Sequence, residues 1–229
     1  MSETKAFFAQ ALAYLKSEEF PENSLTKLGD NASAPARLAW YPALIARQQE
    51  SAIESLFSAC CAAARQLAPG LWRELITAYR HAYQPNSARP TDYARGFVPW
   101  LESWCEQDPS RTTLLLELAD YEWLCFDLTA QPVDAIGEDR AWHIRMYEYP
   151  VTRIVAALAE SQTIDHLLTK EAETLVIFQD ASTARARVLW PTPFMLIALA
   201  VRAGQALPVG IDAARVAEAE TQLRSRGVR

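Results

Sequence analysis

Residues 114–126 read LLLELADYEWLCF, and their apolar side chains recur at the three- and four-residue spacings of an amphipathic helix. Within that helix, Leu118 and Glu122 fall on the same apolar face. Glu117 and Asp120 are expected on the opposite face, in contact with water. An ionised carboxylate on an apolar face is costly unless it has a partner. Glu122 is therefore either the acid of a reaction or held by a specific basic partner.

A structural role for Glu122 is favoured over a catalytic one, because no second acid or base accompanies it at a set spacing. The best available partner is Arg37, which shares one face of a predicted helix with Tyr41. A guanidinium can bind a carboxylate through two parallel hydrogen bonds, and a phenol hydroxyl can add another. We predict a structural clamp of Arg37, Tyr41 and Glu122, and we assign no catalytic residue to the chain.

The stretches that precede this helix also have helical periodicity, so residues 1–130 are predicted to form a helical N-terminal domain. The expected helices cover residues 1–16, residues 35–67 with a kink near Pro42, residues 71–83 and residues 93–105. Residues 17–33 are polar and rich in turn formers, which is typical of a link.

After Gly137 the pattern changes to the alternation of a half-buried strand, in residues 142–149. Two further strands, at 175–178 and 184–190, are predicted to form a β-hairpin. Short helices are expected to begin at Pro150, at Thr192 and after Asp212, which is a suitable N-cap. We therefore predict a mostly α protein with a small α+β part. A helical bundle domain (1–130) would precede a winged-helix-like or peptide-recognition-like domain (138–229), with a linker at 131–137.

Composition narrows the function classes. The chain has 229 residues, half of them hydrophobic, and a formal charge of −6. Only seven glycines occur and no phosphate-loop or dinucleotide motif is present, while the acidic balance makes a nucleic-acid partner less favoured than a protein or peptide. His81, His143 and His166 are far apart, so no metal site is predicted. The four cysteines, the lack of a signal sequence and the lack of a long apolar run favour a cytoplasmic protein with buried thiols and no membrane contact.

The C-terminal half allows three interpretations. A hairpin with short helices matches a winged-helix outline, but the helix that would read DNA (194–201) is almost entirely apolar. Arg185 and Arg187 alternate along the hairpin and would provide phosphate contacts. Alternatively, an exposed edge strand would accept an extended peptide through main-chain hydrogen bonds. In the third interpretation, the hairpin only packs on helices.

Several segments resemble those of a known bacterial family, in the same order and across residues 35–204. They are ARLAWY (36–41), YARGFVPWL (93–101), LADYEW (118–123), RMYEYPVTRI (145–154) and LVIFQD (175–180), which are similar to the motifs ARL-x-x-Y, YG-x-x-F-x-x-FL, LA-x-LEW, Y-x-x-PVHRI and L-x-V-x-RD. The family is the HvfC/BufC-like family, long labelled DNA-binding, and the last two motifs belong to its HvfC-type branch. Thr152 stands where that branch usually has histidine, and Gln179 where arginine is common.

The resemblance implies a non-catalytic accessory subunit that captures a ribosomally made precursor peptide. It would present the peptide to a multinuclear non-heme iron oxidase, which modifies its cysteines. The partner would hold the iron, and no cofactor is expected in this chain. The candidate residues for contact with the peptide or the partner are Arg145, Tyr147, Tyr149, Arg153, Arg185, Arg187 and Trp190. The alternative is a DNA-binding transcriptional regulator, and an independent enzyme that uses Glu122 is the third class.

Overall fold

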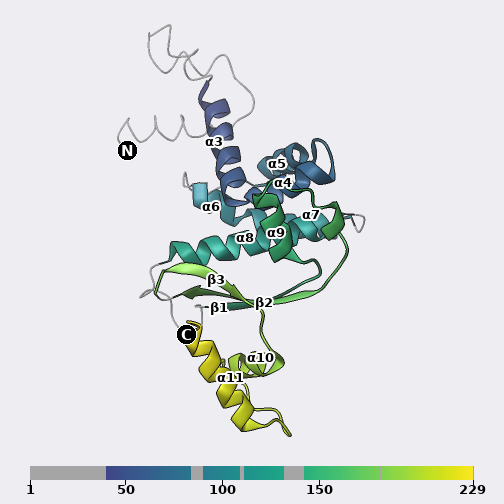
Figure 1. Cartoon of the computed structure of the whole chain (residues 1–229). Helices are drawn as coiled ribbons and strands as arrows, with labels where there is room; N and C mark the ends of the chain where they lie inside the picture. The colour runs from purple at the N-terminus through teal and green to yellow at the C-terminus, as the bar shows by residue number, and fades with distance from the viewer. Residues whose placement is uncertain (1–39, 84–89, 109–110, 132–141, 181, 229) are drawn as a thin grey trace, which may run out of the picture. The chain divides into compact units, whose positions relative to one another are not determined.

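The computed structural model describes residues 40–83, 90–108, 111–131, 142–180 and 182–228 (Figure 1). By its internal contacts the chain divides into two units, residues 1–53 and residues 54–229. Helix α3 (Trp40–Leu56) ends in the second unit, which holds every other described element. The predicted helix at 1–16 and the link at 17–33 lie outside the described residues.

The helix predicted at 35–67 consists of two helices in the structure. Pro42 lies within α3, and the chain breaks at Phe57, whose φ of −117° and ψ of 50° are not helical. Helix α4 (Ser58–Leu67) then begins at once. Phe57 is fully buried, and its ring lies 4.9 Å from that of Phe97. The break turns this aromatic ring into the core, which a continuous apolar helical pattern does not reveal.

Two glycines lie immediately before helices α5 and α7. Gly70 adopts a left-handed φ of 89° at the start of α5 (Leu71–Ala82), a conformation that glycine accepts at little cost. Gly96 separates α6 (Pro90–Arg95) from α7 (Phe97–Glu106), where one helix was predicted across 93–105. A Cβ atom at Gly96 would lie 2.5 Å from the Tyr83 ring, so any larger residue would require this tyrosine to move.

Helix α8 (Leu114–Ala130) is the helix predicted at residues 114–126, and it lies between helices α4 and α7 and the sheet (Figure 1). It packs on α4 and α7 on one side, and on strands β2 and β3 and helix α9 on the other. Its buried side chains include Leu115, Leu118 and Leu128. Because both sides are covered, Glu117 and Asp120 contact other elements, and their expected place on a purely solvent-facing side was wrong.

The sheet has three antiparallel strands in the order β1–β2–β3, namely β1 (Trp142–Tyr147), β2 (Glu173–Asp180) and β3 (Arg185–Leu189). Trp142 pairs with Phe178 in the first ladder, and Val176 pairs with Leu189 in the second. Helix α9 (Val151–Ala159) and a short 3-10 helix, η4 (Asp165–Leu167), connect β1 to β2. The predicted strands and hairpin are confirmed.

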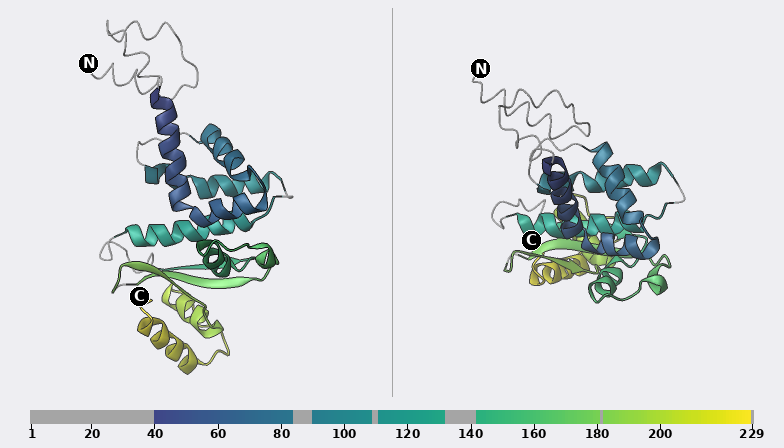
Figure 2. Two further views of the ribbon diagram at one scale, coloured as in Figure 1. Left: turned by 45° about the horizontal axis from the view of Figure 1, so that its top comes forward. Right: turned by 90° about the horizontal axis from the view of Figure 1, so that it is seen from above.

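The face of the sheet that points away from α8 is covered by α10 (Pro193–Arg202) and α11 (Ala213–Ser225), as Figures 1 and 2 show. Val176 and Phe178 of β2 pack there against Leu199 and Leu223. The N-cap of α10 is Thr192, and the predicted N-cap Asp212 accepts a hydrogen bond from Ala214 N (2.9 Å) at the start of α11.

The structure confirms a mostly helical chain with a small antiparallel sheet. The predicted linker at 131–137 lies outside the described residues except for Gln131, and the division into domains 1–130 and 138–229 stays a prediction. Contacts between α8 and the sheet cross that boundary. Among the described helices, none combines the length and the apolar character needed to cross a bilayer.

Candidate functional site

The carboxylate of Glu122 binds the N-terminus of α4. Its Oε1 accepts a hydrogen bond from Ala59 N (2.7 Å) and its Oε2 accepts one from Cys60 N (3.0 Å), while the Ser58 hydroxyl donates to Oε1 (3.2 Å). These amides have no partner within the helix, so an acceptor from another element stabilises the helix start. Burial raises the pKa of Glu122, and the hydrogen bonds from residues 58–60 oppose that rise.

Among the described residues, the partner of Glu122 is thus a helix N-terminus and not the basic side chain that was expected. Arg37 lies outside the described residues, and the side chain of Tyr41 is likewise not described. The predicted clamp of Arg37, Tyr41 and Glu122 therefore stays a prediction.

Asp120, one helical turn from residue 117, holds strand β1 to α8. Its Oδ2 accepts hydrogen bonds from Arg145 Nε (2.9 Å) and from Tyr147 Oη (2.9 Å). The side chain of Arg145 keeps 39% of its surface exposed, whereas Tyr147 is only 3% exposed. Burial and the nearby Asp120 charge raise the pKa of Tyr147, so its phenol stays a hydrogen-bond donor. Arg145 is exposed enough to contact a ligand, and the buried Tyr147 shares its acceptor, Asp120 Oδ2.

Glu117 fixes the turn between β1 and α9. Its two carboxylate oxygens accept hydrogen bonds from the backbone N–H groups of Glu148 (2.7 Å) and Tyr149 (3.0 Å). Burial raises the pKa of Glu117, and the two backbone hydrogen bonds oppose that rise. A carboxylate that accepts two backbone amides at once restrains the whole turn, because both amides must stay aligned with it.

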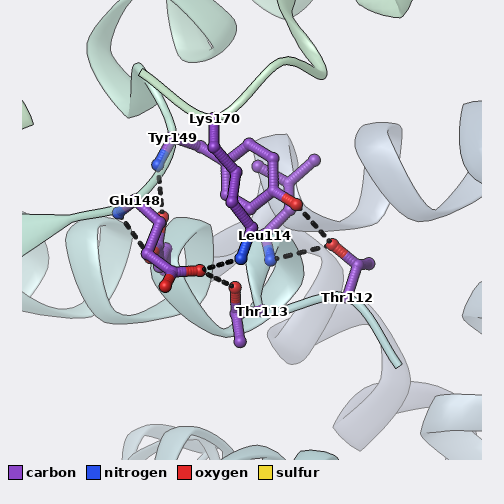
Figure 3. Close-up of polar contacts among 7 residues, drawn as sticks. Thr112, Thr113, Leu114, Glu148, Tyr149 and Lys170 are labelled. Carbon is purple, nitrogen blue, oxygen red and sulfur yellow. Dashed lines mark hydrogen bonds and ion pairs between the residues drawn. The ribbon is translucent and has the colours of Figure 1, made fainter. Parts of the chain in front are cut away.

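Figure 3 shows the polar contacts around the same turn. Glu148 Oε2 accepts from Lys170 Nζ (2.7 Å) and from the hydroxyl of Thr113 (3.1 Å). The hydroxyl oxygens of Thr112 and Tyr149 lie 3.4 Å apart, and the Lys170 ammonium lies 6.0 Å from the centre of the Tyr149 ring. Tyr149, a predicted contact residue, is therefore mostly enclosed by its own neighbours.

Two other predicted contact residues lie near the start of β2. Arg153 on α9 forms an exposed ion pair with Glu171. The indole N–H of Trp190 donates to Glu173 Oε1 (2.8 Å), although 61% of Trp190 remains exposed. Glu173 also accepts hydrogen bonds from the N–H and the hydroxyl of Thr152 (3.2 and 2.6 Å), so the threonine at this position helps to tie α9 to β2.

Arg185 and Arg187 lie on β3, toward the opposite end of the hairpin from Trp190. Both are exposed, and Arg187 pairs with Asp180 at 3.0 Å. The seven predicted contact residues thus do not form one cluster. Arg145 and Tyr147 meet at Asp120, Arg153 and Trp190 meet carboxylates at the start of β2, and the two hairpin arginines lie apart from both groups.

Gln179 stands where the similar family motif commonly has arginine. In the structure its side chain caps the C-terminal end of α8. The residue is 5% exposed, and its side-chain amide donates to the carbonyl oxygens of Leu128 (2.7 Å) and Gln131 (2.8 Å). These carbonyls end α8 and lack a helical partner. The available signal was a polar side chain within the apolar run of a strand, which indicates a buried hydrogen bond.

Among the strands that the structure describes, β1 pairs with β2 alone, along one of its two edges. In an antiparallel ladder, residues whose backbone groups point toward the partner alternate with residues whose groups point away. Ala186 N donates to Thr129 Oγ1 (3.1 Å), so the pair Ala186–Gln179 does not exchange ladder hydrogen bonds. Gln179, and with it Ile177 and Leu175, must turn backbone groups toward β1.

The same alternation defines the free edge of β1. His143 and Arg145 oppose Ile177 and Leu175 and bond to β2, so Trp142, Ile144 and Met146 direct their N–H and C=O groups outward. Within the part of the chain that the structure describes, no other backbone group bonds to these three.

Among the described residues, Arg145 Nη1 donates to the outward carbonyl of Ile144 (3.2 Å), and the side chain of Met146 is 75% exposed. An open strand edge with an exposed apolar side chain can pair with another extended segment.

No cluster of three or more His, Cys, Asp or Glu side chains that could hold a metal ion occurs among the described residues. Cys60 and Cys61 are buried, and burial raises the pKa of the Cys60 thiol. Comparison with protein-family models and with curated proteins finds no match for the chain.

Proposed function

We propose that this chain is a non-catalytic accessory protein that binds an extended precursor peptide along β1. The observation that carries the proposal is the open edge at Trp142, Ile144 and Met146. An added strand would form main-chain hydrogen bonds with these residues, each worth about 0.5–1.5 kcal/mol net. Main-chain pairing supplies affinity, and neighbouring side chains supply sequence preference.

The contacts that hold β1 against α8 favour peptide binding along this strand. Asp120 and Glu117 on α8 fix the middle of the strand and the turn after it, through Arg145, Tyr147 and the amides of Glu148 and Tyr149. A strand that is already held in place loses little conformational freedom when a peptide binds, so less of the binding free energy is spent on ordering.

We extend the proposal to the finer architecture and to the partner. The hairpin β2–β3 with α10 and α11 on one face supports a winged-helix-like peptide-recognition module, preceded by a helical bundle domain. The HvfC/BufC-like resemblance supplies the partner, a multinuclear non-heme iron oxidase that would modify cysteines in the bound peptide. Iron would belong to that partner, and this chain would act in the cytoplasm.

The direct test uses the short, cysteine-containing peptide that this account expects to be encoded beside the gene. Met146→Pro removes an outward N–H that β2 does not use, and proline is tolerated on edge strands. The variant should bind the labelled peptide about five- to tenfold more weakly, because one hydrogen bond is lost and the added strand is displaced. Fluorescence anisotropy measures the change.

The matched control is Met146→Val, which keeps the N–H group and an apolar, strand-forming side chain. Its affinity should stay within about twofold of the wild type. Circular dichroism checks that both proteins are folded. If Met146→Pro and the wild type then bind the peptide with equal affinity, the peptide does not bind along β1.

A second candidate function, duplex DNA binding, is favoured by one observation. Residues 182–229 contain seven arginines against three Asp or Glu, although the whole chain is acidic. Against it, α10 buries Met195, Ala198 and Leu199 in the core and has one basic residue, Arg202, at its end. A mobility shift with duplex DNA that weakens steeply with salt, and is reduced in Arg185→Gln, would support the regulator instead.

A further inference from the structure

Arg145 bridges helix α8 and the free edge of β1. Its Nε donates to Asp120 Oδ2 (2.9 Å), and its Nη1 donates to the carbonyl oxygen of Ile144 (3.2 Å). That carbonyl is one of the groups that β1 directs away from β2. The guanidinium therefore occupies an acceptor of the open edge while 39% of its side chain stays exposed. Charged side chains on an edge strand also hinder unwanted strand pairing.

A strand that pairs with β1 would change the surroundings of Arg145 in a defined way. An N–H group of the added strand would bind the Ile144 carbonyl and so release Nη1. The residue of the added strand opposite Arg145 would lie on the same face of the sheet, with its Cβ about 4.5–5.5 Å from that of Arg145. Its neighbours would lie on the other face, opposite Ile144 and Met146.

We propose that β1 selects an extended segment with a carboxylate opposite Arg145, placed between two apolar residues that face Ile144 and Met146. The inference rests on the proposed function, since it concerns the peptide that binds this edge. Opposite charges across two strands attract, and an apolar neighbour covers the exposed Met146.

The hydrogen bonds around Asp120 allow Arg145 Nη1 to leave the Ile144 carbonyl and bind a carboxylate of the peptide. Tyr147 Oη donates to the same carboxylate oxygen that Arg145 Nε binds, at 2.9 Å in both cases. When Nη1 turns to the peptide, Asp120 keeps Nε of Arg145 and the phenol of Tyr147 as partners. The arginine can therefore serve both carboxylates without leaving either one unpaired.

The test uses three labelled synthetic peptides of nine residues in which valine and threonine alternate and the central threonine is Glu, Gln or Lys. At low salt the Glu peptide should bind the wild type about fivefold more tightly than the Lys peptide. The difference should disappear in Arg145→Gln and reverse in Arg145→Glu. Arg73→Gln, which changes an exposed arginine on α5, is the matched control and should keep the wild-type order.

The outcomes separate this inference from the proposed function. Equal binding of the three peptides by the wild type would overturn the selection by Arg145 while leaving strand addition in place. If none of the three peptides binds, and Met146→Pro binds the encoded precursor as tightly as the wild type does, both the selection by Arg145 and the strand addition at β1 are overturned. A concentration-dependent dimer in ultracentrifugation, lost in Met146→Pro, would show that a second copy occupies the edge, and this too would overturn the inference.

Discussion

Glu122 joins two helices through a single side chain. Its carboxylate accepts hydrogen bonds from Ala59 N and Cys60 N, at the place where the chain leaves the break at Phe57 and starts α4. Without it, two buried or half-buried amides would need another acceptor. Glu122 thus holds the start of α4 in place.

Replacing Glu122 by alanine is predicted to lower the free energy of unfolding by about 1–3 kcal/mol, since the α4 amides lose their acceptor. The control Glu102→Ala changes an exposed glutamate on α7 and should stay within about 0.5 kcal/mol of the wild type. Urea unfolding followed by circular dichroism measures both. A Glu122→Ala protein as stable as the control would show that water satisfies these amides equally well.

At the scale of elements, Gln179 couples strand β2 to the end of α8 through the carbonyls of Leu128 and Gln131. Gln179→Leu keeps the bulk of the side chain but leaves both carbonyls without this donor. We predict a loss of about 1–3 kcal/mol in the free energy of unfolding.

The matched change at an exposed glutamine of α11, Gln222→Leu, should have little effect on stability. Unfolding midpoints in urea provide the comparison. Equal midpoints for the two variants would mean that the Gln179 hydrogen bonds contribute nothing net to the stability of the fold.

Periodicity predicted the elements whose pattern is local. The spacing in α8, the alternation in β1, the helix start near Thr192 and the N-cap Asp212 each depend on neighbours in sequence, and the structure contains all four. The break at Phe57 could not be predicted in this way, because residues 56–64 are apolar enough to read as one continuous helix. The place of the break depends on contacts with α7 and α8, which are remote in sequence.

The candidate site was predictable only in part. Arg145 and Tyr147 were expected near a peptide, and the structure joins them at Asp120, a residue expected to face water. Helix α8 is covered by helices on one side and by the sheet on the other, so a two-sided hydrophobic–polar pattern misplaces its acidic residues. The open edge of β1 depends on strand order, which the sequence of a single chain does not determine.

At the scale of the whole molecule, we propose that the chemistry belongs to a partner protein. When this chain and the iron oxidase expected to be encoded beside it are expressed together, we predict that the two proteins elute as one complex in size-exclusion chromatography. Iron measured by mass spectrometry should accompany the oxidase. The chain purified alone should contain no stoichiometric iron, and finding it there would contradict the accessory role.

The most direct test of the central claim is amide hydrogen exchange of β1, measured by NMR in the free protein and with the encoded precursor peptide. In the free protein, the amides of Ile144 and Met146 should exchange quickly, while those of His143 and Arg145, bonded to β2, should be protected. Peptide binding should protect Ile144 and Met146 as well. Protection of these two amides before peptide is added, or unchanged fast exchange in the saturated complex, would contradict strand addition at β1.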